Sequence, residues 1–455
     1  MIIDRSKRPS SSDEVNFSSP KIQEFILKNG LKVFFSEKKE LPIIRIIILV
    51  NSGSRFDPND KKGLSNLLTM CIDEGAGEFD TLKLADEFEM LGAQFSVSCN
   101  DDVIIISLQV LNENLIPSLK LVSDVITNPH FNEEDFNREK NKVVVRLKQS
   151  KSEPDYVADI AFDYCLFGKD SQYGFPVTGI EKTIQNIQPD SIRNVYSNNF
   201  TPNNSTMVLV GNIEQDRLIK DLESAFEEWD KVSTIDYPRF HPKENKKKIF
   251  LINKPDAVQT EIRMGHLSSK RSDVDYFQKQ IINLILGGQF SSRLNLNLRE
   301  KNGYTYGVHS RFNYFKEAGY FAVSTSTDIT NTKNALQEIY KELIEIKSGL
   351  TNNELNFAKS SITKKYPSNF ETYRQVAANI STKIIHDLPD DYFETYIDKV
   401  NLISLDDVNR IAESSIHTEQ LISVLVGDSK KILNQLNEND FGEITALEFD
   451  DLFKN

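Results

Sequence analysis

The sequence predicts an α+β fold of two homologous domains, each a mostly antiparallel sheet with helices packed on one face. Three observations lead to this prediction: the chain repeats itself once, one segment alternates as a β-hairpin does, and other segments carry apolar residues at helical spacing. The length of 455 residues suits two or more domains, and 39% hydrophobic with 27% charged residues is typical of a globular protein.

The internal repeat defines the two domains. Three pairs of segments match at shifts of 216 to 219 positions: Val208–Gly211 with Val424–Gly427, Lys32–Phe35 with Lys248–Leu251, and Phe131–Lys140 with Leu350–Lys359. Between the halves, Pro238, Pro242 and a run of charges interrupt the hydrophobic periodicity. We therefore predict domains at residues 1–230 and 246–455, joined by a linker at 231–245.

Within the first half, strands and helices can be assigned from their periods. Residues 95–99 alternate apolar and polar side chains, turn at 100–102 and return through 103–110, which predicts an antiparallel hairpin. Leu115, Leu119, Val122 and Ile126 form the stripe of an amphipathic helix. Asn132 then begins another helix, whose first turn is acidic.

Charge and hydropathy exclude several classes of function. The 54 Lys and Arg residues against 67 Asp and Glu residues give a net charge of −13, which is unsuited to a surface for nucleic acid. The most apolar run, residues 43–50, is too short to span a membrane. The N-terminus shows no secretory signal pattern, so we expect a cytoplasmic location, or a periplasmic one if a signal peptide has been removed. The three cysteines have no CxxC spacing, which argues against disulfides and a thiolate zinc cluster.

Two motifs carry a resemblance to a known family. Gly63–Met70 opens a helix in the first half, and Arg299–Tyr306 ends one in the second. The stretches that begin at Leu27, Asn51 and Pro154 occur in the matching order. With these segments the chain resembles, over nearly its whole length, the pitrilysin/insulinase family of zinc peptidases, which includes the mitochondrial processing peptidase.

The family's zinc site is degenerate in this chain. The resemblance implies an inverted motif, His-x-x-Glu-His, in which two imidazoles one helical turn apart bind zinc and the Glu is the general base. Here the three positions are occupied by Asn66, Thr69 and Met70, and the family's third ligand, a Glu on a later helix, aligns with Arg146. The six histidines stand in no zinc-ligand spacing. We therefore predict that this chain binds no catalytic zinc in the family's manner.

The second half keeps the residues that the family uses beside its zinc. The resemblance implies that Arg299 and Tyr306, seven positions apart, reach the reaction centre, where a phenol can donate to the oxyanion and a guanidinium can hold a substrate carbonyl. An ordinary helix-end arginine and a strand tyrosine are the alternative. Gly287 and Gly288, with Phe290 beside them, resemble a short remnant of the glycine-rich loop that helps substrate entry, and equally could simply end a helix.

These observations predict a noncatalytic subunit of a two-subunit zinc endopeptidase. A zinc-bearing paralogue would supply the metal, and Arg299 and Tyr306 would act in trans on an unfolded peptide. The chain would be inactive alone, so whether it counts as an enzyme is open. The alternative is a scaffold or peptide-binding protein of the same fold that takes part in no hydrolysis, for which a homodimer is possible.

Overall fold

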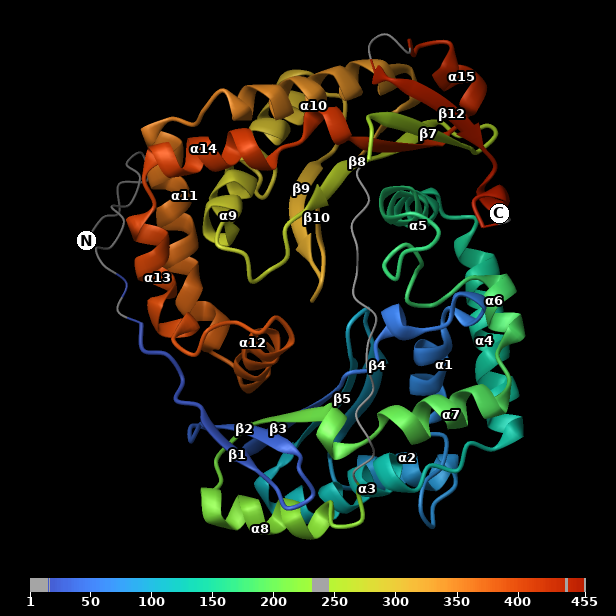
Figure 1. Ribbon diagram of the computed structural model, residues 1–455, viewed down its shortest axis with the longest axis vertical. Coiled ribbons are helices and arrows are strands. Elements are labelled where there is room, and N and C mark those ends of the chain that lie inside the picture. The colour runs from blue at the N-terminus through green and yellow to red at the C-terminus, as the bar shows by residue number, and fades with distance from the viewer. Residues whose placement is uncertain (1–14, 16, 231–244, 438–440, 454–455) are drawn as a thin grey trace, which may run out of the picture.

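Two six-stranded sheets form the framework of the protein. Figure 1 shows the computed structural model, which describes residues 15, 17–230, 245–437 and 441–453. The first sheet has the order β1-β2-β6-β3-β5-β4. Its strands are β1 (Gln23–Ile26), β2 (Lys32–Glu37), β3 (Ile43–Val50), β4 (Gln94–Cys99), β5 (Ile104–Leu111) and β6 (Ser205–Gly211).

The second sheet repeats this arrangement, in the order β12-β7-β11-β8-β10-β9. Its strands are β7 (Lys248–Asn253), β8 (Gln259–Ser268), β9 (Val308–Tyr314), β10 (Gly319–Asp328), β11 (Ile422–Gly427) and β12 (Glu443–Leu447). The matching segments Val208–Gly211 and Val424–Gly427 lie in β6 and β11, the third strand of each sheet. Most neighbouring strands run antiparallel. The parallel pairs are β2–β6, β7–β11 and β7–β12. The predicted fold class is therefore confirmed.

The predicted hairpin and helices also occur. The hairpin is β4–β5, in which Cys99 pairs with Ile104, and the two predicted helices are α3 and α4. The helices of the first half are α1 (Leu64–Cys71), α2 (Thr81–Met90), α3 (Leu115–Thr127), α4 (Glu133–Ser150), α5 (Pro154–Phe167), α6 (Glu181–Asn186), α7 (Pro189–Asn199) and α8 (Gln215–Ala225). Those of the second half are α9 (Tyr276–Leu286), α10 (Thr332–Lys347), α11 (Asn352–Lys365), α12 (Tyr373–Ile385), α13 (Tyr392–Leu402), α14 (Leu405–Ser415) and α15 (Ser429–Leu433).

In the described part of the chain, none of the helices has the length and apolarity that crossing a bilayer requires.

Each sheet buries one face against helices of its own half. In the first half, Leu67 of α1 and Val122 of α3 pack with Ile48 of β3 in one core. In the second half, Ile281 of α9 and Leu336 of α10 pack with other apolar side chains of that half in another. The amphipathic stripes of these helices account for this layer, because the apolar side of each helix faces the sheet.

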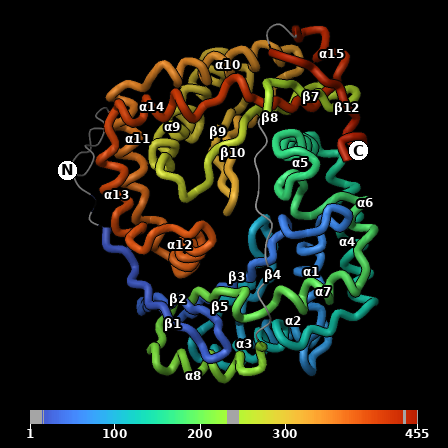
Figure 2. The backbone as a smooth tube through the Cα atoms, viewed as in Figure 1, coloured from blue at the N-terminus to red at the C-terminus, as the bar shows by residue number. Residues whose placement is uncertain are grey.

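The opposite face of each sheet is covered by a helix from the other half. Helix α5 belongs to the first half but packs on β8 and β11, where Phe162 joins Ala322 and Val424 in a buried cluster. Helix α12 belongs to the second half but packs on β3 and β6, where Val376 joins Ile47 in the reciprocal cluster. Figures 1 and 2 show α5 beside the upper sheet and α12 beside the lower one.

One glycine makes room for the exchanged helix. A Cβ atom at Gly265 of β8 would lie 2.9 Å from Cζ of Phe162 and 2.0 Å from the carbonyl oxygen of Phe321. The missing side chain therefore lets α5 approach the second sheet closely. Packing assigns α5 to the second half, whereas the predicted boundaries assign it to the first. Those boundaries stay a prediction, because residues 231–244 of the predicted linker lie outside the described residues.

A buried polar junction also ties the halves together. The Asp102 carboxylate, in the β4–β5 turn, pairs with Arg55 Nε at 3.2 Å and accepts a hydrogen bond from Tyr173 Oη at 3.1 Å. Its other oxygen accepts from the backbone N–H of Lys316, in the β9–β10 turn, at 2.8 Å. The ring of Phe315 stacks on Tyr173 with centroids 4.5 Å apart. The tips of two hairpins, one from each sheet, therefore meet over a charged pair that is almost completely buried.

We expect Phe162→Ala to destabilise the second sheet, although Phe162 belongs to the first half by sequence. Removing a buried ring from a close-packed site costs about 3 to 5 kcal/mol of unfolding free energy. Hydrogen exchange should therefore accelerate most in β8 and β11. The control is Leu67→Ala, which removes a buried side chain within the first half and should affect β3 and β6 most. If both variants accelerated hydrogen exchange equally in both sheets, the conclusion that α5 supports the second sheet would be contradicted.

We also expect Asp101, the neighbour of Asp102 in the β4–β5 turn, to add stability as the pH falls. Burial, with the nearby Asp102 carboxylate, raises the pKa of Asp101 to about 7. A carboxyl group whose folded-state pKa is raised takes up a proton on folding, so the unfolding free energy rises as the pH is lowered from 8 towards 5. Urea unfolding at several pH values should show this increase, of up to about 1 kcal/mol per pH unit, in the wild type. Asp101→Asn should reduce this increase but not abolish it, because Asp57, whose pKa burial raises to about 6, also contributes. Asp398→Asn, at an exposed position of α13, should leave the increase unchanged.

Candidate functional site

Helix α1 is held at its start by a buried carboxylate. Asp57 accepts hydrogen bonds from the backbone N–H groups of Gly63 and Ser65, each at 3.0 Å, and from Ser65 Oγ at 2.6 Å. Burial raises the pKa of Asp57 to about 6, although these hydrogen bonds favour its charged form. Gly63 adopts φ +93°, and a Cβ there would lie 2.7 Å from the carbonyl oxygen of Thr178. The glycine that precedes the degenerate motif therefore has a structural role.

The three degenerate zinc positions on α1 interact with one another. Asn66 and Met70 are half-buried one turn apart, and Asn66 Nδ2 lies 3.9 Å from Met70 Sδ. Thr69 is buried, and its hydroxyl donates to the carbonyl oxygen of Asn66 at 2.8 Å. An amide, a hydroxyl and a thioether replace the imidazoles and carboxylate that zinc favours. The side chains present therefore do not fit a zinc ion of the family's type.

The fourth position, Arg146, lies exposed on α4, which packs against α1. The carboxylate that α4 buries is instead Glu139, one of the acidic groups whose charges act on Glu74 just after α1. Glu139 pairs with Arg138 and Lys142, so its charge is already compensated. Across the described ranges, the structure contains no group of three His, Cys, Asp or Glu residues placed to hold a metal ion.

Arg299 lies on a π-helical turn, η5 (Asn295–Lys301), over an aromatic ring. Its guanidinium carbon is 4.4 Å from the ring centroid of Phe290, and its Nε is 3.5 Å from a Glu300 carboxylate oxygen. The Arg299 side chain is 38% exposed and Phe290 is 63% exposed. The guanidinium is therefore oriented by its neighbours while part of it stays accessible.

Tyr306 projects from the loop that joins η5 to β9. It is 92% exposed, and within the described residues its hydroxyl has no hydrogen-bond partner. The expectation of a strand tyrosine is wrong, because β9 begins two residues later, at Val308. Gly303, which follows η5, takes the left-handed conformation, with φ +65°.

A buried asparagine fixes both ends of this loop. Asn295, at the start of η5, donates from Nδ2 to the carbonyl oxygen of Val308 at 2.7 Å, and its Oδ1 accepts from the Val308 backbone N–H at 3.2 Å. Asn297 donates to Glu338 and Glu342 of α10. The segment that carries Arg299 and Tyr306 is therefore anchored to the body of the second half.

The glycine pair ends helix α9. The backbone N–H groups of Gly287 and Gly288 both donate to the carbonyl oxygen of Asn283, at 3.0 and 2.8 Å. A Cβ at Gly287 would lie 2.5 Å from Ser310 Oγ, so this residue also lets α9 approach β9 closely. These contacts describe a helix end, as the structural alternative expected. They leave the proposed role of the pair and of Phe290 in substrate binding as a prediction.

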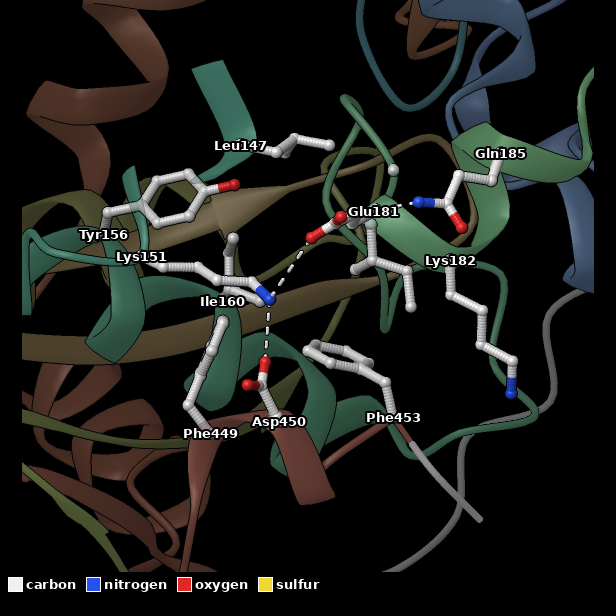
Figure 3. A pocket seen from close by; sticks show the side chains of 12 residues that line it. Leu147, Lys151, Tyr156, Ile160, Glu181, Lys182, Gln185, Phe449, Asp450 and Phe453 are labelled. Carbon is white, nitrogen blue, oxygen red and sulfur yellow. Dashed lines mark hydrogen bonds and ion pairs between the residues drawn. The ribbon is translucent and has the colours of Figure 1, made fainter. Parts of the chain in front are cut away.

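None of the predicted site residues lines the cavity shown in Figure 3. This cavity, of about 350 Å³, lies between α4, α5 and α6 on one side and Phe449, Asp450 and Phe453 on the other. Lys151 Nζ stands between two carboxylates, 2.8 Å from Asp450 and 3.7 Å from Glu181. The ion pair between Lys151 and Asp450 therefore links the C-terminal segment to the first half.

Comparisons with known proteins agree with this two-domain arrangement. The family model described as insulinase (peptidase family M16) matches residues 32–164, and the one described as peptidase M16 inactive domain matches residues 186–362. A crystal structure of a peptidase M16 inactive domain from Pseudomonas fluorescens superimposes with a TM-score of 0.84 at 25% identity, covering 90% of this chain and 98% of that one.

The relatives include proteins described as peptidases and a protein described as a non-peptidase homolog. The chain is 23% identical to the uncharacterized zinc protease YmxG of Bacillus subtilis, covering 90% of this chain and 98% of that protein. It is 24% identical to the non-peptidase homolog YmxG of Helicobacter pylori, covering 88% and 92%. It is 21% identical to the human mitochondrial-processing peptidase subunit alpha, covering 88% and 81%. With both of the family's models matched in order along the sequence and the family's fold in each half, this chain belongs to the insulinase family of peptidases, M16.

Proposed function

We propose that this chain is the noncatalytic subunit of a two-subunit zinc-dependent endopeptidase. The observation that carries the proposal is the combination of an accessible Arg299 and Tyr306 on an anchored loop with an α1 that offers no metal ligands. A similarity to one subunit of a processing peptidase and to a non-peptidase homologue supports it. A paralogue of the same fold that keeps the His-x-x-Glu-His motif would be the partner, and would supply metal and base.

The chemistry of the two side chains suits a role in trans. Hydrolysis of an amide places negative charge on the carbonyl oxygen, and a hydroxyl with no partner of its own, such as that of Tyr306, is free to donate to it. Arg299 offers a fork of donors for a backbone carbonyl of the peptide, and Phe290 below it limits the directions in which the guanidinium can point. Both side chains are exposed, so a peptide bound at the partner's zinc could contact them.

A non-hydrolytic scaffold or peptide-binding role remains the alternative of a different class. The name of the Helicobacter pylori relative favours it, because that protein is described as a non-peptidase. The protein that copurifies from native cells distinguishes the two. A paralogue that carries His-x-x-Glu-His supports the peptidase subunit, whereas a homodimer supports the scaffold.

We predict that the chain purified alone holds far less than one zinc ion per chain. The physical reason is that Asn66, Thr69 and Met70 present neither an imidazole nor a carboxylate. Metal analysis after exchange into metal-free buffer tests this, with the zinc-bearing paralogue treated identically as the control that must retain its metal. Stoichiometric zinc bound beside Asn66 or Arg146 would refute the proposal.

We further predict that Tyr306→Phe lowers the endopeptidase activity of the mixture of the two chains by about a hundredfold. Removing one donor to an oxyanion commonly costs on the order of 10² to 10³ in kcat. The rate of cleavage of an unfolded peptide, sensitive to a chelator, is the measurement. Tyr304→Phe, which changes a half-buried tyrosine two residues away, should leave the rate unchanged. An unchanged rate for Tyr306→Phe would remove Tyr306 from the mechanism.

A further inference from the structure

A second cavity of about 350 Å³ is lined in part by a buried arginine, Arg271. It lies between the start of α9, the start of α13 and the segments that precede them. Figure 1 shows the loop that leads from β8 into α9 turned towards the middle of the molecule. The polar lining includes Arg271, Asp273, Tyr276, Gln278, Tyr392 and Lys399, and the apolar lining includes Phe277, Leu388, Pro389 and Ile403.

Arg271 has no negative partner in the described part of the chain. Its side chain is only 8% exposed, and the hydrogen bond that the structure gives it runs from Nη2 to the hydroxyl of Tyr392. The guanidinium carbon lies 3.0 Å from the ring centroid of Tyr276 and 5.2 Å from that of Tyr392. These cation–π contacts offset part of the cost of burying a cation, but they supply no counter-charge.

The two acidic residues just before α9 are engaged with other groups. Asp273 accepts from the backbone N–H of Lys270 at 3.1 Å. Asp275 accepts from Ser269 Oγ at 3.0 Å and pairs with Lys279 Nζ at 2.7 Å. Lys399 lines the same cavity and adds a second cation. The cavity therefore carries an excess of positive charge on its polar side.

Two further polar groups in this region have no hydrogen-bond partner among the residues that the structure describes. Gln278 Oε1, which belongs to the lining, is buried without a hydrogen bond, and so is the Nδ1 atom of His386. Burial, and then the charge of Arg271, lower the pKa of His386 to about 4. The side chain of Asp275, the residue before α9, accepts no hydrogen bond from the N–H groups in the first turn of this 11-residue helix. The first-turn N–H groups, which are positive, thus add to the field of Arg271.

We propose that this cavity binds a carboxylate that is attached to an apolar group. The carboxylate would pair with the guanidinium of Arg271, with Lys399 and the Tyr392 hydroxyl as further donors, while Phe277, Leu388 and Ile403 contact the apolar part. A bidentate pair with a carboxylate is the arrangement that a guanidinium makes best. The free end of a peptide and a small organic acid share this chemistry. The site does not depend on the proposed peptidase function.

Binding of N-acetyl-phenylalanine, followed by calorimetry on the full chain, tests the proposal. The matched control ligand is N-acetyl-phenylalanine amide, which keeps the size and the ring but lacks the charge. The acid should bind at least tenfold more tightly than the amide. A longer peptide that ends in a free phenylalanine distinguishes the two sources: equal or tighter binding points to peptide ends, and binding of the small acid alone points to an organic acid.

Two variants and one control assign the binding to this cavity. Arg271→Lys should weaken binding of the acid about tenfold, because an ammonium cannot make the bidentate pair. Lys399→Met, at a half-buried position that does not support the core, should weaken it at least threefold. Lys364→Met removes a charge from an exposed position on α11 and should change nothing. Equal affinity for acid and amide, no detectable binding of the acid, or an unchanged affinity in the folded Lys399→Met protein would overturn the proposal.

Discussion

The reciprocal packing of α5 and α12 is the constraint on which the rest of the molecule depends. Each sheet has one face that its own helices cover and a second face on which a helix from the other half packs. Without the exchange, each half would expose a continuous apolar surface, which soluble proteins avoid. The buried Arg55–Asp102 pair and the hairpin tips around it then set the mutual position of the two sheets. The relative placement of α1 and η5 is therefore a property of the whole chain.

This arrangement explains how α1 keeps its place in the fold without metal ligands at the predicted zinc positions. Helix α1 is held by Asp57 at its start and by its apolar side in the first core, and neither depends on the side chains at 66, 69 and 70. Thr69 is satisfied by a backbone carbonyl within α1, and Met70 packs against the core. In the second half, Asn295 and Asn297 anchor a loop to the body of the domain. The outer side chains of this loop, Arg299 and Tyr306, support no part of the core. The exposure of these two side chains is compatible with the role in trans that we propose for them.

Much of the fold could be predicted from the sequence, and the residues show why. The repeat places β6 and β11 at the same position of two sheets, and the alternation of residues 95–110 gives the β4–β5 hairpin. The packing of α5 on the second sheet could not be predicted, because the apolar side of this helix has the same pattern whichever sheet it covers. The Arg55–Asp102–Tyr173 junction joins residues far apart in the chain, and the sequence signalled only the stretch from Asn51 that contains Arg55. Tyr306 was identified by its spacing from Arg299, whereas its exposure follows from the late start of β9, which no local pattern indicates.

The packing of α12 on the first sheet also has a consequence for the folding of the chain during its synthesis on the ribosome. The last strand of the first sheet ends at Gly211, but α12 begins only at Tyr373, about 160 residues later. At roughly 5 to 20 residues per second, the interval lasts on the order of ten seconds or more. During it, Ile47, Leu49, Val208 and Val210 have no covering helix. A nascent chain in this state displays an apolar strand surface to the solvent, so its biogenesis calls for a chaperone that shields the surface until the second half has emerged.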